Sequence, residues 1–227
     1  MSGAYKNVEN LMKQNDYSKA LPILLNLIET NPEDWNLHFM VGQCHRFKKD
    51  FQAAVSHLEI ASKLKPEETV VLHALGIAYQ LNNQLNDAVN ALSQALDSDP
   101  HYVPSMNSLG LTYRILGDLK SALKWYSKAA ETHMNITIAP MLADKEISYT
   151  DTPDGGRHIN DKVFKKSQEL LKANPIYATL KNNMGVCFRE MGDLDTAREQ
   201  FTESIVFTPD GFQYDEPRKN LAAITGS

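Results

Sequence analysis

Few residues in this sequence have the type and spacing that catalysis or metal binding needs, and these residues lie far apart. The two cysteines, Cys44 and Cys187, are the strongest nucleophiles and soft metal ligands it offers, but neither belongs to a motif with metal-ligand spacing. His38 and His45 share one predicted helix, yet no third ligand lies near them in the sequence. The histidines are therefore expected in the core or on a binding face, and neither a metal nor a cofactor is expected.

Two acidic or glycine-rich stretches have structural explanations. Asp97 and Asp99 flank Ser98 just before Pro100, as in a polar turn. The stretch 154–158 contains two glycines but is too short for a phosphate loop, and no strand precedes it. Because no nucleophile, base and orienting group occur together, no catalytic residue is predicted and the chain is not expected to be an enzyme. One alternative stays open, an enzyme with its site in the irregular segment 133–158.

Charge and hydropathy exclude several classes of partner. The net charge is -5, which disfavours a nucleic-acid phosphate backbone as ligand. No run of 18 apolar residues occurs, and the first residues lack the profile of a secretory signal. The low cysteine count suits a reducing compartment. We therefore expect a cytoplasmic protein that binds neither nucleic acid nor a membrane.

An internal repeat in the sequence predicts the helices that would position any functional site. Glycines recur at intervals of 34 residues, and the same kinds of residue recur around them. The glycines are Gly42, Gly76 and Gly110. Three residues after each comes a ring, in His45, Tyr79 and Tyr113. Twelve and nineteen residues after each comes an alanine, in Ala54, Ala88 and Ala122 and in Ala61, Ala95 and Ala129.

Apolar residues between these markers follow the 3.6-residue period of helices, so each unit predicts two helices joined by a polar turn. An aspartate stands just before several of the second helices, where a carboxylate accepts a free backbone N–H. These aspartates are Asp16, Asp50, Asp118 and Asp193. Small side chains at the alanine positions would let the two helices approach closely.

This pattern resembles the tetratricopeptide repeat. The resemblance implies an all-α fold, a right-handed superhelical solenoid of antiparallel helix pairs with about five to six repeats, one of them degenerate, an insertion and a C-terminal capping helix. It implies a single domain over residues 1–227. The predicted repeats cover about 1–34, 35–68, 69–102 and 103–136, then an irregular or degenerate repeat over 137–177, a repeat over 178–211 and the capping helix over 212–227.

The irregular segment interrupts the repeat pattern. Pro140 is expected to begin a short helix through Ile147, and a helix over about 161–173 is expected as the second helix of the degenerate repeat. A long connection of this kind is either functional or a tolerated surface insertion, and both interpretations stay open.

The family resemblance implies that a partner protein or peptide lies in the concave groove lined by the first helix of each repeat. The groove positions match these residues: Phe39, Gln43, Arg46, Phe47, His73, Gln80, Asn107, Arg114, Asn182 and Arg189. The three arginines each stand four residues after a glycine. Because guanidinium groups grip carboxylates at two points, an extended, acid-containing segment is the predicted ligand. The alternative interpretation is that these are solvated polar residues on an exposed helix face.

The sequence also bears on two further classes of partner, heat-shock chaperone tails and other copies of this chain. The family's clamp for heat-shock chaperone tails needs lysine, asparagine and arginine, but its positions hold Tyr5, Glu9, Met40, Val70 and Ala74. A chaperone tail is therefore disfavoured. The main function hypothesis is a non-catalytic scaffold or adaptor for other proteins, and the alternative is a self-associating structural scaffold, that is, a homo-oligomer.

Overall fold

The computed structural model describes residues 3–142, 149–151, 157–159 and 161–226. These residues divide into two compact units, 1–112 and 113–227, which are considered separately below. The described helices of the first unit are α1 (Gly3–Lys13), α2 (Tyr17–Thr30), α3 (Trp35–Phe47), α4 (Phe51–Leu64), α5 (Thr69–Leu81) and α6 (Leu85–Ser98). Helix α7 (Val103–Ile115) crosses the boundary between the units. The described elements of the second unit are α8 (Leu119–Leu142), β1 (Tyr149–Asp151), β2 (Arg157–Ile159), α9 (Asp161–Lys172), α10 (Ile176–Glu190), α11 (Leu194–Val206) and α12 (Glu216–Thr225).

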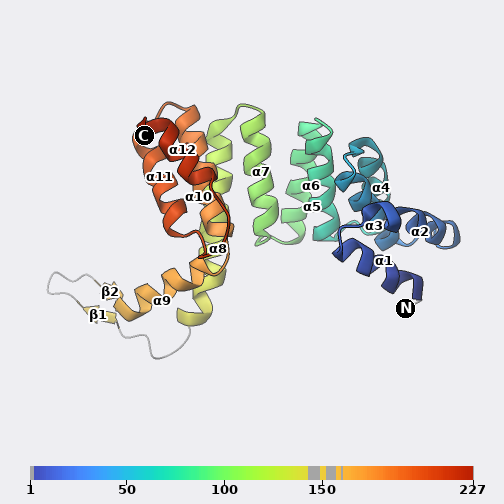
Figure 1. The fold of residues 1–227 in the computed structure, drawn as a ribbon, viewed down its shortest axis with the longest axis horizontal. Helices are drawn as coiled ribbons and strands as arrows, with labels where there is room; N and C mark the ends of the chain where they lie inside the picture. The colour runs from blue at the N-terminus through green and yellow to red at the C-terminus, as the bar shows by residue number, and fades with distance from the viewer. Residues whose placement is uncertain (1–2, 143–148, 152–156, 160, 227) are drawn as a thin grey trace. The chain divides into compact units, whose positions relative to one another are not determined.

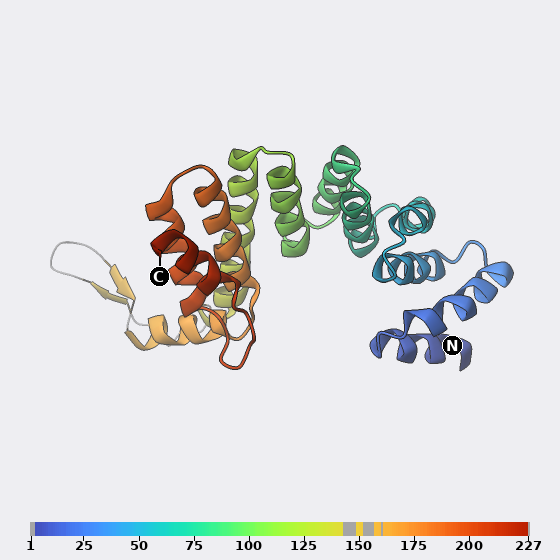
Figure 2. The same cartoon turned by 45° about the horizontal axis from the view of Figure 1, so that its top comes forward.

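Consecutive helices pack as pairs within each unit. In the first unit α3 lies against α4 and α5 against α6, and α4 also packs on α5 (Figure 1). In the second unit α10 packs on α11, and α12, dark red in Figure 2, lies against both of them. The predicted all-α class, the helix pairs and the C-terminal capping helix are therefore confirmed. A single domain over residues 1–227 stays a prediction.

The turn inside each pair has a common backbone geometry. One residue in each of these turns has a positive φ, in the left-handed region. These residues are Asn15, Lys49, Asn83, Gly117 and Gly192. The next residue but one begins the second helix. The aspartates predicted to cap these helices do so: the side chains of Asp16, Asp50 and Asp193 accept the backbone N–H three residues on. Asp118 accepts the N–H of Ser121 in the same way.

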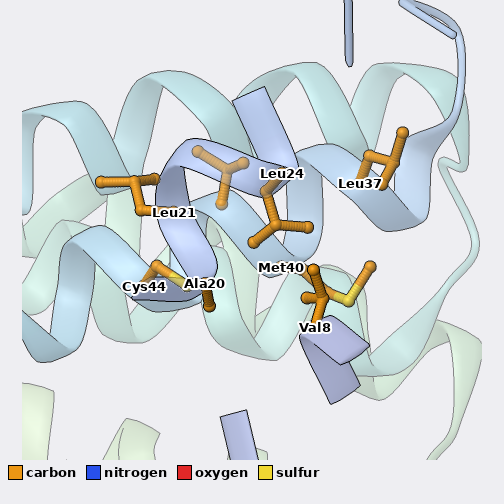
Figure 3. Close-up of a cluster of buried hydrophobic side chains, with 8 residues drawn as sticks. Val8, Ala20, Leu21, Leu24, Leu37, Met40 and Cys44 are labelled. Carbon is orange, nitrogen blue, oxygen red and sulfur yellow. The ribbon is translucent and has the colours of Figure 1, made fainter. Parts of the chain in front are cut away.

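Small residues bring the paired helices together. The repeated alanines on the second helices are fully buried. A β-carbon on Gly42 would lie 2.6 Å from Leu58 Cγ, so only glycine allows α3 to approach α4 this closely. Figure 3 shows the core of the first helices, where Val8 of α1, Leu24 of α2 and Leu37 of α3 converge. Close approach and interlocking side chains give each pair its packed interior.

The irregular segment differs from expectation in two ways. Pro140 does not begin a new helix but lies inside α8, which continues without a break from Leu119 to Leu142. The later part of the expected short helix, 143–147, lies outside the described residues. The short strands β1 and β2, which the sequence did not predict, pair antiparallel with Thr150 opposite His158. The helix expected over about 161–173 is present as α9.

Candidate functional site

Four predicted groove residues come from α3, and three of them join one contact cluster. Arg46 donates from Nε to Oε1 of Gln43 at 2.8 Å, and its guanidinium carbon lies 4.2 Å from the centroid of the Phe47 ring. Tyr17 of α2 stacks on Phe47 with ring centroids 4.3 Å apart and planes 5° from parallel. We call Tyr17, Gln43, Arg46 and Phe47 the Arg46 cluster. It presents a cation, an amide and two aromatic rings, of which Phe47 is 49% exposed.

The charge of Arg46 is not neutralised by the described part of the chain. Burial lowers the pKa of its guanidinium, and Tyr17 opposes that effect. No carboxylate among the described residues forms an ion pair with it. A guanidinium of this kind is able to form two charge-assisted hydrogen bonds with a carboxylate.

Phe39, the fourth groove residue on α3, has a packing role. It lies against the core of α1 to α3 and also against the core formed by α4, α5 and α6. It therefore joins two neighbouring hydrophobic clusters. A residue used in this way contributes more to stacking of the helix pairs than to contact with a ligand.

Helix α5 contributes His73 and Gln80. His73 Nε2 lies 3.3 Å from Ser108 Oγ, and its ring meets Tyr102 edge-on at 5.3 Å between centroids. Burial, followed by the charge of Arg46, lowers the pKa of His73 to about 4, so the ring is neutral at pH 7. Gln80 Nε2 is buried with no hydrogen-bond partner among the described residues. Asn107 of α7 is half-buried.

In the second unit the groove residues are bound by the chain itself. Arg114 Nη1 pairs with Glu190 Oε1 at 2.8 Å. Arg189 Nη1 donates to Oδ1 of Asn220 at 2.9 Å, and Asn220 Nδ2 donates to Asn182 Oδ1 at 3.0 Å. Asn182 is 6% exposed. Of the three equivalent arginines, Arg114 pairs with a carboxylate, whereas Arg46 and Arg189 each donate to an amide oxygen.

Sequence reasoning missed Tyr17, Glu190 and Asn220. Tyr17 lies on a second helix, which the groove positions of the repeat do not include. Glu190 follows Arg189 directly and occupies the place that Phe47 holds in α3, which was a usable signal. Asn220 belongs to the capping helix, which follows the last repeat. The repeat pattern therefore gives no groove position for it.

The described residues were also compared with the requirements of a metal site, a reactive thiol and a membrane-spanning helix. Within the ranges that the structure describes, no group of three His, Cys, Asp or Glu side chains is placed to hold a metal ion. Cys44 and Cys187 are free and buried. The alternative enzyme site over 133–158 includes residues 143–148 and 152–156, which lie outside the described ranges, and it stays untested. Over those ranges, none of the helices has the length and apolar character needed to span a membrane.

Comparison with known proteins agrees with the fold of paired helices. The family model described as tetratricopeptide repeat matches residues 5–68 and 73–135. The crystal structure of MamA has a TM-score of 0.65 at 14% sequence identity, over 91% of this chain and 95% of that one. MamA 41-end from Desulfovibrio magneticus RS-1 has a TM-score of 0.66 at 16% identity, over 90% and 92%.

The third similar structure is TTC0263, a thermophilic TPR protein in Thermus thermophilus, with a TM-score of 0.61 at 16% identity, over 99% of this chain and 98% of that one. At these identities the likeness concerns the fold. No curated protein matches the sequence.

Proposed function

This chain belongs to the tetratricopeptide-repeat family, and from that premise we propose that it is a non-catalytic scaffold that binds an extended, acid-containing segment of another protein. Arg46 is the principal cationic contact. Gln43 and the exposed ring of Phe47 form the rest of the surface that the segment meets.

The observation that carries the proposal is the uncompensated charge of Arg46. Its Nε is held by Gln43, which fixes the direction of the guanidinium. The terminal nitrogens then remain for a carboxylate, which a guanidinium binds at two points. Arg114 already pairs with the carboxylate of Glu190, so it contributes less to such a ligand.

The aromatic pair beside Arg46 adds an apolar element. Tyr17 and Phe47 form a stacked surface next to the cation. A segment that alternates a carboxylate with a large apolar side chain would use both parts at once. Buried apolar area supplies affinity, and the ion pair supplies selectivity.

The test is a titration of synthetic peptides of equal length against the full chain. One series varies the number of carboxylates, and a second keeps the carboxylates and removes the apolar side chains. We expect binding that increases with carboxylate number, and Arg46→Gln should weaken it about tenfold or more, since hydrogen bonds to charged groups contribute roughly 1.5–3 kcal/mol.

The matched control is Arg198→Gln. Arg198 lies exposed on α11 and pairs only with Asp195 of its own helix among the contacts described. Equal binding of acidic and neutral peptides would reject the acidic ligand. Equal losses for Arg46→Gln and Arg198→Gln would reject the Arg46 cluster as the site. Concentration-dependent growth in particle mass without peptide would favour self-association instead.

A further inference from the structure

Three histidines meet between α3 and α4. His38 Nδ1 lies 3.2 Å from His57 Nδ1, and the rings of His45 and His57 stack with centroids 5.8 Å apart and planes 10° from parallel. His38 and His45 come from α3 and His57 from α4. We call these residues the histidine trio. It is peculiar to this helix pair, because the matching positions of the next pair hold Leu72, Tyr79 and Ala91.

The hydrogen bonds assign the ring protons. His38 Nε2 lies 3.0 Å from the carbonyl oxygen of Pro32, and a carbonyl only accepts, so His38 Nε2 carries the hydrogen. Neutral His38 must then accept at Nδ1, and His57 Nδ1 must donate. His45 Nδ1 lies 3.1 Å from Asp50 Oδ2 and donates to that carboxylate.

Proton uptake conflicts with this arrangement. A proton added to His38 Nδ1 would place two N–H groups against each other across 3.2 Å, which breaks the bond between α3 and α4. A proton added to His57 goes to Nε2 and leaves its bond to His38 in place, but it creates a cation beside two other imidazoles.

The titratable groups that face His57 act in opposite directions, because neighbouring imidazoles disfavour a protonated ring and a carboxylate favours it. From α3 these are His38 and His45, and from the turn before α4 it is Asp50, whose carboxylate is bonded to His45. On α5, Tyr79 donates to Glu59 and not to the trio. Burial first, then His38 and His45, lowers the pKa of His57. The folded state therefore takes up this proton less readily than the unfolded chain.

We propose that the histidine trio is a pH-dependent switch in which proton uptake at mildly acidic pH separates α3 from α4. Helix α3 also carries Gln43, Arg46 and Phe47, so the switch alters the shape of the Arg46 cluster. That consequence rests on the proposed function, whereas the switch itself does not.

The direction of the pH effect on stability follows from the linkage between proton binding and folding. A histidine whose folded-state pKa is lowered adds stability that is present at neutral pH. This stability is lost as the pH falls below the ordinary histidine value of about 6.5. The packing of α3 on α4 should therefore weaken over that window. The α10–α11 pair holds no histidine and serves as an internal reference.

The test is amide hydrogen exchange of the full chain at pH 7.5 and pH 5.0, corrected for intrinsic exchange rates. We expect protection in α3 and α4 to fall relative to α10 and α11, because the unfolded chain takes up the His57 proton more readily than the folded protein does. His57→Gln keeps a donor toward His38 but cannot take the proton, so it should abolish the fall. His133→Gln removes a buried histidine of the second unit and should leave the fall in α3 and α4 intact.

An equal change in all four helices, or a fall that persists in His57→Gln, overturns the switch. Nitrogen-15 spectra of the unmodified chain provide a second measurement that needs no variant. Neutral His38 should carry its proton on Nε2 and His57 on Nδ1. The opposite tautomers would also overturn the proposal.

Discussion

Gly76 lies directly against Leu92: a β-carbon on Gly76 would stand 2.5 Å from Leu92 Cγ and 2.7 Å from its Cδ2. Leu92 is fully buried and cannot turn aside into solvent. The approach of α5 to α6 therefore depends on the missing side chain, as the approach of α3 to α4 depends on Gly42.

Replacing Gly76 with alanine should destabilise the protein although alanine favours helices. Overpacking of a close crossing costs roughly 1–3 kcal/mol, which exceeds the gain of about 1 kcal/mol from helix propensity. Denaturant unfolding measures the net change. Gly3→Ala is the control, because nothing lies within 4 Å of a β-carbon there and no loss is expected. A Gly76→Ala protein as stable as the parent would contradict the close contact.

Stability should fall as the pH drops from about 6.5 to about 4, in part because of His73. Its folded-state pKa of about 4 lies below the unfolded value, so the unfolded chain binds the proton first. Proton binding stabilises the unfolded chain relative to the folded protein over this window. The effect amounts to about 3 kcal/mol. Unfolding free energies measured at several pH values should show a shallower decline in His73→Phe, which cannot titrate. Parallel curves for the two proteins would rule out His73 as a source of the pH dependence.

Asn220 should hold the capping helix in place. Its amide donates to the buried Asn182 and accepts from Arg189, so Asn220→Ala leaves both groups without these bonds. Loss of a partner by a buried polar group costs roughly 1–3 kcal/mol. Limited proteolysis should detect faster cleavage near α12. Lys219→Ala, an exposed neighbour on the same helix, should cleave at the parental rate. Similar rates for both variants would show that the amide network contributes little.

Both thiols should be inert in the folded protein. Cys44 and Cys187 are 0% exposed, and burial raises the pKa of each to about 11. The thiolate fraction at pH 8 is then roughly a hundredfold below that of a free cysteine. Reaction with a thiol reagent should be slow in buffer and complete in denaturant. Rapid labelling without denaturant would mean that the helices around these residues open easily.

The sequence predicted the helix pairs and their close contacts because the signals are local and repeat. A glycine every 34 residues, with alanines at fixed distances and a capping aspartate at the turn, depends only on neighbouring residues and on helix geometry. The same local reasoning failed at Pro140. Pro140 stays inside α8, although proline lacks the N–H for one backbone hydrogen bond of the helix.

The tertiary structure decided how each predicted site residue is used. Arg46, Arg114 and Arg189 are equivalent in the repeat, yet Arg114 meets Glu190 and Arg189 meets Asn220. His57 joins His38 and His45 only because α3 and α4 pack face to face. Periodicity fixes which face of a helix a residue occupies, but charge compensation and proton sharing depend on side chains from distant helices. Those partners are set by packing, which the spacing of residues along the chain does not encode.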